Sequence, residues 1–235
     1  MINEVVILAG GKATRLYPVT HTVAKAMLDI NGEPFIAHQL RLLKRQGIKR
    51  VVICAGYLAE QISSYVKQGQ DFGLDVEFSL DGDKLLGTGG AIKKALPLLG
   101  NSFFVMYGDS YLDSDFLPIA EKFKHERKSA LMTVLKNNGR WDKSNILYQD
   151  GNIVKYDKKN IIPEMEYIDY GLGIIRHDVL QNIVEDVFDL ADVYKRLADN
   201  KDLVAYEVFQ RFYEIGSFNG IEETREYIAS RIQRS

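Results

Sequence analysis

The stretch that decides the fold is VVILAGGKATRL, residues 5–16. Val5 to Ala9 is a short apolar run rich in β-branched residues, which is typical of a strand covered on both faces in a parallel sheet. Gly10 and Gly11 follow at once, and a backbone without Cβ atoms turns sharply and can bring its N–H groups close to an anionic oxygen. The stretch therefore predicts a buried strand that leads into an anion-binding loop.

Two basic residues near this loop would add positive charge to it. Arg15 offers a planar fork of donors to phosphate oxygens, and Lys25 offers a compact point charge. The glycine spacing matches neither G-x-x-x-x-G-K-[ST] nor G-x-G-x-x-G, so a P-loop ATPase and a Rossmann dehydrogenase are disfavoured. On the two glycines alone, a plain strand-to-loop turn beside solvated basic residues is an equal alternative.

The longer pattern L-A-G-G-x-x-T-R-L-x-P-x-T, followed by a lysine, resembles the signature of the sugar-phosphate nucleotidyltransferases, the nucleoside-diphosphate-sugar pyrophosphorylases. The resemblance implies that two basic residues are catalytic, Arg15 at the β- and γ-phosphates and Lys25 near the reacting centre. It also implies that the nucleotide contacts Leu8, Ala9, Gly10 and Gly11.

Three positions depart from the family pattern. The family usually has glycine where this chain has Ala13, and an alanine argues against a positive-φ turn there. The family also has proline on both sides of the lysine, where this chain has Ala24 and Ala26. The loss of both prolines predicts a Lys25 loop that is less rigid before ligand binds.

The composition is that of an ordinary globular protein. A chain of 235 residues with 46% hydrophobic and 26% charged residues is long enough for a sizeable core. We expect one catalytic domain over residues 1–235, with a nucleotide-binding half at about 1–128 and a sugar-phosphate-binding half at about 129–235. The chain stops near the end of the catalytic domain, so the left-handed β-helix extension of some relatives is not expected.

Charge and cysteine content exclude several function classes. A net charge of −2 argues against broad nucleic-acid binding, which needs a basic surface. Cys54 is the single cysteine, which excludes an internal disulfide, and its apolar neighbours predict a small core residue in a reducing compartment. The sequence has no signal peptide and no run of about 18 apolar residues, which predicts a cytoplasmic protein without a membrane segment.

Apolar runs and turn signals alternate along the chain as in an α/β fold. In the first half, strands are expected at 5–9, 51–55, 75–80 and 103–107, with helices near 34–46, 59–68 and 90–96. In the second half, strands are expected at 131–135, 145–148, 153–156 and 171–175, with a hairpin turn at 150–151 and helices at 178–184, 189–200 and 222–232. This order predicts a Rossmann-like three-layer α/β/α fold with a mostly parallel mixed sheet and a smaller sugar-binding lobe.

Asp109 follows the apolar run 103–107 directly after Gly108. Parallel sheets bind ligands at the carboxyl ends of their strands, and carboxylate oxygen is a ligand that Mg²⁺ prefers. On the residues alone, a turn-capping aspartate is an alternative of equal weight. The run resembles the strand-Gly-Asp motif whose aspartate binds the catalytic metal in the family, which implies that Asp109 is a metal ligand and Mg²⁺ the cofactor.

Glu214 stands where the family has a second acidic residue, within FYEIGS at 212–217. The resemblance implies that Glu214 is a metal ligand, although the family residue is an aspartate. The extra methylene lengthens the reach, so direct coordination, water-mediated coordination and a shifted backbone stay open. A glutamate that merely ends a strand is the alternative without a metal.

The glycine-rich stretch LGTGGAI, residues 86–92, opens one of the predicted helices. Free N–H groups at the start of a helix can meet a nucleobase edge or a phosphate. The stretch resembles the family's L-G-T-[AG]-G-A-[IL] loop, which holds the base. The resemblance implies nucleotide contacts from Gly87, Thr88 and Gly89.

Two motifs of the second half carry the expected acceptor side. Asp157-Lys158 resembles the family's [E/D]-K element, whose lysine contacts the phosphate of the sugar 1-phosphate and whose acid contacts sugar hydroxyls. Asp169 and Gly171 lie in a stretch that resembles the sugar-side N-x-G-I strand and are expected to set sugar selectivity. Solvated charges are the alternative for both motifs. Trp141 either packs on a sugar face or belongs to the core.

Together, the residues and the resemblance predict an enzyme that condenses an NTP with a sugar 1-phosphate to give an NDP-sugar and pyrophosphate. The fully glycinic LGTGG loop looks most like heptose 1-phosphate guanylyltransferases, with mannose 1-phosphate guanylyltransferases close by, which favours GTP. Uridylyl or cytidylyl transfer to another sugar 1-phosphate or a phosphorylated alcohol stays open. An inactive regulatory or ligand-binding relative is a further alternative, although Arg15, Lys25 and Asp109 speak against it. The four scattered histidines do not predict a nucleophilic triad or a zinc site.

Overall fold

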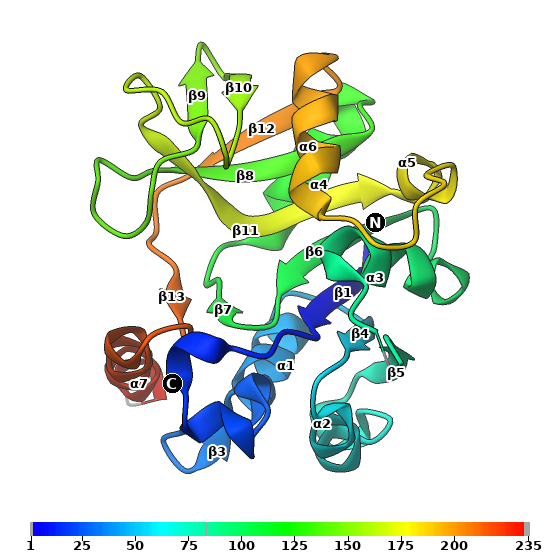
Figure 1. The fold of residues 1–235 in the computed structure, drawn as a ribbon, viewed down its shortest axis with the longest axis vertical. Helices are drawn as coiled ribbons and strands as arrows, with labels where there is room; N and C mark the ends of the chain where they lie inside the picture. The colour runs from blue at the N-terminus through cyan, green and yellow to red at the C-terminus, as the bar shows by residue number, and fades with distance from the viewer. Residues whose placement is uncertain (1, 83, 233–235) are drawn as a thin grey trace.

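Within residues 2–82 and 84–232, which the computed structural model describes, the chain forms a nine-stranded mixed sheet with helices packed on it (Figure 1). Seven strands follow one another in the order β10-β9-β11-β6-β1-β4-β5. Strand β8 pairs with β11, and β12 pairs with β8. The expected fold class, a mostly parallel mixed sheet with flanking helices, is confirmed.

The first half of the chain builds the parallel part of this sheet. Strand β1 lies between β4 and β6 and is parallel to both. Along β1, Val5 and Ile7 belong to one hydrophobic cluster and Val6 to a second, so its alternate side chains enter two different layers. The parallel strands are β1 Glu4–Ala9, β4 Arg50–Ala55, β5 Asp75–Leu80 and β6 Ser102–Tyr107, and the helices between them are α1 Phe35–Arg45, α2 Ala59–Val66 and α3 Gly87–Ala95.

The second half extends the sheet with an antiparallel strand. Strand β11 runs antiparallel to both β6 and β8, and β12 runs parallel to β8. The expected hairpin is present, with β9 and β10 joined by a turn at Asp150-Gly151. These strands are β8 Ala130–Lys136, β9 Ile146–Gln149, β10 Asn152–Tyr156, β11 Tyr167–Arg176 and β12 Leu203–Val208, with helices α4 Phe116–Glu126, α5 His177–Gln181 and α6 Leu190–Asp199.

Two short strand pairs and the last helix complete the fold. Strand β7 (Ser110–Tyr111) follows β6 and pairs with β13 (Tyr213–Glu214), and β2 (Asp29–Ile30) pairs with β3 (Glu33–Pro34). Helix α7 (Phe218–Ile232) then lies beside the N-terminal segment and contacts β2 (Figure 1). The pairing of β7 with β13 thus brings the C-terminal part of the chain to the carboxyl end of β6.

Helix α3 begins at Gly87, three residues earlier than the sequence predicts. Glycine disfavours a helix, but here it permits close packing. A Cβ atom at Gly89 would lie 2.3 Å from the ring of Phe188, and one at Gly90 would lie 2.1 Å from the carbonyl oxygen of Asp186. The tertiary contact with the segment 186–189 therefore outweighs the local preference.

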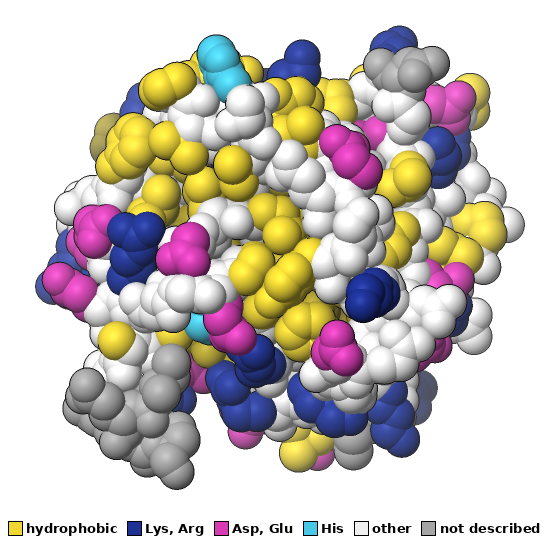
Figure 2. Space-filling view, turned by 90° about the horizontal axis from the view of Figure 1, so that it is seen from below, with side chains coloured by type: hydrophobic (Ala, Val, Ile, Leu, Met, Phe, Trp, Pro, Cys, Tyr) yellow, Lys and Arg dark blue, Asp and Glu magenta, His cyan; other side chains and the backbone are white. Residues whose placement is uncertain are grey.

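On the face shown in Figure 2, apolar side chains fill the middle and upper part, several basic side chains gather along the lower edge, and acidic side chains are scattered among them. Among the residues that the structure describes, no helix has the length and apolar character needed to cross a bilayer.

Candidate active site

Two adjoining cavities open at the carboxyl ends of β1, β4 and β6. The first, of about 270 Å³, is lined by the glycine loop after β1 and by the start of α3, and the second, of about 920 Å³, faces the second half of the chain. Lys25 and Asp109 line both cavities. The predicted residues on the first cavity are Leu8, Ala9, Gly10, Gly11, Gly87 and Thr88, and those on the second are Arg15, Lys158, Asp169, Gly171 and Glu214.

The turn after the glycine loop contradicts one expectation. Ala13 has φ +50° and ψ +48°, which is the left-handed conformation that an alanine was expected to avoid. The hydroxyl of Thr20 donates a hydrogen bond to the Ala13 carbonyl over 2.9 Å. The tertiary fold therefore holds Ala13 in the left-handed conformation, which costs about 1–2 kcal/mol locally.

A clamp from helix α2 holds the Lys25 loop where the family has prolines. The N–H of Ala24 donates to the side-chain oxygen of Gln61 over 2.9 Å, and the Gln61 amide nitrogen donates to the carbonyl of Thr22 over 2.8 Å. Ala24 and Ala26 are both buried. Gln61 thus fixes the loop through hydrogen bonds, and a proline in place of Ala24 would remove one of them.

Asp109 follows β6 as predicted and forms an ion pair with Lys25. The distance from Lys25 Nζ to Asp109 Oδ2 is 2.6 Å, and Ser110 donates its hydroxyl to the other carboxylate oxygen over 3.2 Å. Gly108 permits the sharp exit from the strand, because a Cβ atom there would lie 2.8 Å from the carbonyl oxygen of Leu8. The structure therefore places a cation and a carboxylate together on the wall that the two cavities share.

Glu214 lies beside Asp109, but its carboxylate is engaged by helix α7. Backbone pairing brings the two residues together, since the N–H of Ile215 donates to the Asp109 carbonyl over 2.9 Å. The Glu214 carboxylate accepts hydrogen bonds from the N–H of Gly216 and from the Ser217 hydroxyl, the latter over 2.6 Å. In this arrangement the carboxylate satisfies donors at the start of α7.

The residues present fit a magnesium ion, because Mg²⁺ needs only one or two protein carboxylates and fills its other positions with water and phosphate oxygens. Asp109 offers a carboxylate at the cavity wall. Within the described ranges, His, Cys, Asp and Glu form no group of three or more that could hold a metal. The site therefore suits a cation bound jointly by protein and phosphate.

Two N–H groups of the glycine-rich loop at the start of α3 donate to a neighbouring segment of the chain and not to the cavity. Gly89 and Gly90 donate to the carbonyl of Phe188 over 3.0 and 3.3 Å, and Gly89 lines neither of the two cavities. Thr88 lines the first cavity, and its hydroxyl donates a hydrogen bond to the Asp189 carboxylate over 2.8 Å. The glycines thus serve packing against 186–189 as well as the cavity.

On the acceptor side, Lys158 and Asp169 lie close together in the second cavity. Lys158 Nζ lies 3.7 Å from Asp169 Oδ2 and 5.7 Å from the centre of the Tyr107 ring. The Asp169 side chain is only 6% exposed, and its Oδ1 accepts from the N–H of Gly171 over 2.9 Å. Its Oδ2 is buried without a hydrogen-bond partner among the described groups. This oxygen is available to a donor on a ligand.

Asp157 does not line either cavity, although the sequence assigned it to sugar hydroxyls. Its carboxylate accepts hydrogen bonds from the N–H groups of Lys159 and Asn160, each over 2.8 Å. These bonds lower the pKa of Asp157. Asp157 therefore shapes the turn that carries its neighbour Lys158.

Asp81 is a cavity residue that the sequence reasoning missed. It follows β5 and lines the first cavity, and its carboxylate lies 3.4 Å from the backbone N of Leu86, which donates to it. Burial raises its pKa. The signal was available, because Asp81 follows a predicted strand in the same way as Asp109.

Aromatic and basic side chains line the far wall of the second cavity. Trp141 lies in this lining and packs edge-on against Phe212, with ring centres 6.2 Å apart, so it packs within the protein, and its contact with a sugar face stays a prediction. Arg211, which the sequence reasoning also missed, stacks its guanidinium 4.5 Å from the Tyr213 ring and pairs with Glu223. A lone arginine without a motif gave no signal in the sequence.

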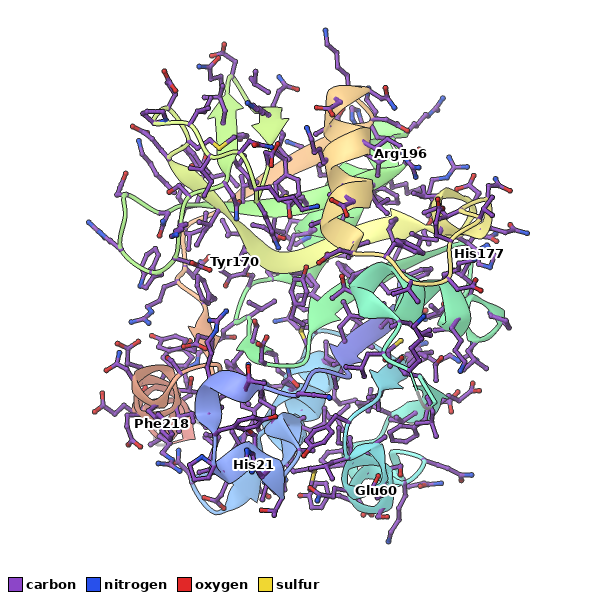
Figure 3. All side chains as sticks on the ribbon, viewed as in Figure 1. His21, Glu60, Tyr170, His177, Arg196 and Phe218 are labelled. Carbon is purple, nitrogen blue, oxygen red and sulfur yellow. The ribbon has the colours of Figure 1, made fainter. Side chains whose placement is uncertain are left out.

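Cys54 lies in the core, as the sequence predicts. Cys54 is buried, and burial raises the pKa of its thiol to about 12, so it is an unreactive core residue. The His38 side chain is hydrogen-bonded to the Ile30 carbonyl. His21 and His177 lie on separate parts of the fold (Figure 3). The described histidines form no cluster.

Comparison with known proteins places this chain in a family. The profile of the Nucleotidyl transferase family matches residues 4–224. The chain belongs to this family. Its matched relatives are named sugar-phosphate nucleotidyltransferases.

Among these nucleotidyl transferases, the UTP-glucose-1-phosphate uridylyltransferase of Synechocystis sp. is 30% identical over 217 residues. The D-glycero-alpha-D-manno-heptose 1-phosphate guanylyltransferase of Campylobacter jejuni is 28% identical over 199 residues. The alignments cover 84% and 83% of this chain, and the chain spans 55% of the first relative and 87% of the second.

Solved structures show the same fold. HddC from Yersinia pseudotuberculosis, complexed with GMP-PN, superposes with a TM-score of 0.80 at 25% identity, covering 97% of this chain and all of that one. A glucose-1-phosphate thymidylyltransferase from Bacillus anthracis gives a TM-score of 0.84 at 22% identity, covering 95% of this chain and 94% of that chain. The second likeness concerns the fold alone.

Proposed function

We propose that this protein transfers a nucleotidyl group from an NTP to a sugar 1-phosphate, giving an NDP-sugar and pyrophosphate. The observation that carries the proposal is the position of Lys25 and Asp109 on the wall shared by the two cavities. A nucleotide in the first cavity and a sugar phosphate in the second would meet at this wall. The nucleotide-binding half and the sugar-phosphate-binding half of the chain then each supply one substrate site.

In this reaction, an oxygen of the sugar phosphate attacks the α-phosphorus of the NTP, and the bond to the leaving pyrophosphate breaks. The attacking phosphate is already an anion, so charge neutralisation and alignment matter more than proton removal. We assign Arg15 to the β- and γ-phosphates, Lys25 to the phosphates at the reacting centre and Lys158 to the incoming phosphate. All three line the second cavity.

We assign Asp109 as the carboxylate that would hold Mg²⁺ together with phosphate oxygens. The ion supplies neutralisation of the phosphate charge when it is bound. Glu214 would join it directly only by leaving the hydrogen bonds at the start of α7, so we assign it a water-mediated contact. Lys25 would then exchange its ion pair with Asp109 for contacts to phosphate.

We propose GTP as the nucleotide, and Asp81 supports this choice. Guanine presents two adjacent donors, N1–H and N2–H₂, which a carboxylate can accept as a pair, while uracil presents one donor between two carbonyl oxygens. Asp81 lines the first cavity beside Gly87 and Leu85, and both its oxygens accept hydrogen bonds when ionised. The guanylyltransferase relatives point the same way.

We propose a heptose or mannose 1-phosphate as the acceptor. The buried Oδ2 of Asp169, which has no hydrogen-bond partner among the described residues and lies 3.7 Å from Lys158 Nζ, would accept a hydrogen bond from a sugar hydroxyl. Gly171, with φ +92°, lets β11 bend beside it in the second cavity. The names of the relatives support this acceptor class.

The test is a panel of the four NTPs and dTTP against sugar 1-phosphates, with Mg²⁺, followed by pyrophosphate release and product mass. We expect an NDP-sugar with GTP as the preferred donor. Asp81→Asn should lose the preference for GTP, because an amide offers one acceptor where the carboxylate offers two. A preference for UTP in the intact protein would favour the uridylyltransferase alternative, which the Synechocystis relative supports. No pyrophosphate with any pair would refute the proposed reaction.

A further inference from the structure

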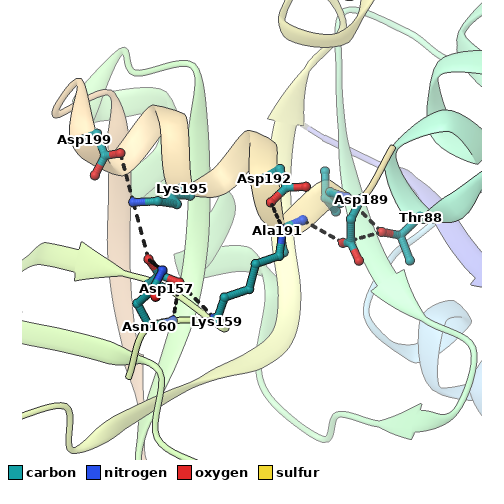
Figure 4. Close-up of polar contacts among 10 residues, drawn as sticks. Thr88, Asp157, Lys159, Asn160, Asp189, Ala191, Asp192, Lys195 and Asp199 are labelled. Carbon is teal, nitrogen blue, oxygen red and sulfur yellow. Dashed lines mark hydrogen bonds and ion pairs between the residues drawn. The ribbon is translucent and has the colours of Figure 1, made fainter. Parts of the chain in front are cut away.

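Helix α6 connects the turn that carries Lys158 to the loop at the first cavity. Figure 4 shows the polar contacts along this helix. Its residues Leu190–Asp199 run beside β10, whose last residue Tyr156 precedes the turn. Because an α-helix rises 1.5 Å per residue, Asp189 and Lys195 are about 9 Å apart along its axis, and they contact different parts of the site.

In the middle of α6, Lys195 forms an ion pair with Asp157. Lys195 Nζ lies 3.6 Å from Asp157 Oδ2 and 3.2 Å from Asp199, and Asp157 is only 4% exposed. The same Oδ2 of Asp157 also accepts a hydrogen bond from the side-chain amide of Asn160 over 3.2 Å. The whole carboxylate is therefore occupied by groups of the turn and of α6, and none of these contacts faces the second cavity.

At the N-terminal end, α6 is fastened to the loop of the first cavity. Asp189 caps the helix by accepting from the N–H of Ala191 over 2.9 Å. Thr88 donates its hydroxyl to the same Asp189 oxygen over 2.8 Å and accepts from the N–H of Leu190 over 2.8 Å. The cap of α6 is thus shared between a residue of the helix and a residue of the glycine-rich loop.

The first turn of α6 also contacts the Lys158 turn. Asp192 pairs with Lys159, with 3.0 Å between Oδ1 and Nζ. A helix that loses its N-cap frays in its first turn. Loss of the Asp189 cap would therefore loosen Asp192 and its ion pair with Lys159, which directly follows Lys158 in the chain.

We propose that Asp157 and Asp189 are positioning residues, and that α6 acts as a strut that fixes Lys158 relative to the nucleotide loop. This inference rests on the proposed function only in taking Lys158 as the ligand of the incoming phosphate. Asp157 acts on the substrate through Lys158, and Asp189 acts through the first half of the helix, which carries Asp192 and Lys195.

The experiment measures the phosphate affinity of Lys158 in the full chain without other substrates. Lysines are labelled with pyridoxal 5′-phosphate and borohydride, and the Lys158 peptide is quantified by mass spectrometry with increasing inorganic phosphate. Exposed Lys124 on α4 is the internal reference. In the intact protein, we expect phosphate to protect Lys158 and not Lys124.

Four variants separate the strut from a general loss of stability. Asp189→Ala should raise the half-protecting phosphate concentration about five-fold, and Asp157→Ala about ten-fold. Asp189→Asn keeps an acceptor for both bonds and should stay within about two-fold of the intact protein. Asp178→Ala removes an exposed ion pair with Arg176 at the start of α5 and should leave protection unchanged.

Unchanged protection in Asp189→Ala would overturn the strut, even if Asp157→Ala responds. A shift of equal size in Asp178→Ala would also overturn it, because the effect would then follow general stability. If phosphate does not protect Lys158 in the intact protein, the assignment of Lys158 in the proposed function fails as well. Substrate turnover in the NTP panel tests that function independently.

Discussion

Ala13 shows how a single residue can keep a family turn after losing the family's glycine. Its φ of +50° is a backbone conformation that glycine adopts freely, whereas the Cβ atom of alanine makes it unfavourable. The sequence pattern named the turn correctly but gave the wrong conformation for this residue. Local preference could not reveal the Thr20 hydrogen bond that helps to hold the turn.

We expect Ala13→Gly to raise the free energy of unfolding by about 1 kcal/mol, since glycine relieves the left-handed strain. Urea denaturation measures this change. Ala120→Gly in helix α4 is the matched control and should lower the free energy by about 0.5–1 kcal/mol. A loss of stability in Ala13→Gly would contradict the assigned backbone conformation.

Gln61 is a second residue whose role only the fold reveals. We expect Gln61→Ala to lower kcat about ten-fold, because the Lys25 loop loses two hydrogen bonds. Steady-state turnover measures the effect. The control is Ser64→Ala, at an exposed position on the same helix, which should keep normal turnover. Equal turnover in both variants would mean that Gln61 does not order the loop.

Among the elements, the start of α7 decides how Glu214 is used. The sequence predicted Glu214 as a metal ligand, and its backbone does lie beside Asp109. The pattern could not show that the longer side chain reaches the donors of Gly216 and Ser217. Whether it also contacts the metal stays a prediction.

Two substitutions distinguish a helix-capping role of Glu214 from direct coordination of the metal. Glu214→Gln keeps an acceptor for α7, so we expect turnover to fall less than ten-fold and the unfolding midpoint to change little. Asp109→Asn removes the charge at the cavity wall, and we expect turnover to fall at least a hundred-fold. Equally severe losses in the two variants would indicate that Glu214 coordinates the metal directly.

Across the other elements, the sequence predicted the buried parallel strands best. Val6 and Ile53 lie in apolar runs rich in β-branched residues. The strands that contain them, β1 and β4, begin and end within one residue of the expected limits. Helix α4 and strand β12 were missed, and β11 is longer than expected. These elements depend on tertiary pairing, as in the contact of β12 with β8, which no short pattern encodes.

At the scale of the whole molecule, the site is built where strands from distant parts of the chain end together. The order of motifs predicted that Arg15, Lys25, Asp109 and Lys158 would share a site, and the second cavity contains all four. The pattern did not show that Asp157 faces its own turn, where it accepts from the N–H groups of Lys159 and Asn160 and pairs with Lys195 of α6. It could not predict the Arg211 stack either.

Several carboxylates contribute to a pH dependence of global stability. Hydrogen bonds from Arg41 lower the pKa of Glu33, and backbone N–H groups of Asn160 and Lys159 lower the pKa of Asp157. A lowered folded pKa means that the stabilisation is present above the unfolded value of about 4 and is lost as the pH falls through the folded value. We therefore expect the free energy of unfolding to decline below about pH 4.

Urea unfolding between pH 2 and 7 measures this decline. Asp157→Asn keeps most of the turn but has no titrating group, so its curve should be flatter on the acid side. An acid limb as steep as that of the intact protein would show that Asp157 does not contribute to it.

The central claim is that Lys25 and Asp109 mark the point where a nucleotide and a sugar phosphate react. The most direct measurement is the formation of GDP-sugar from GTP and mannose or heptose 1-phosphate with Mg²⁺, followed by product mass in the intact protein and in Asp109→Asn. We expect the product and stoichiometric pyrophosphate from the intact protein and a loss of at least a hundred-fold in the variant. A folded Asp109→Asn protein with normal product formation would contradict the account.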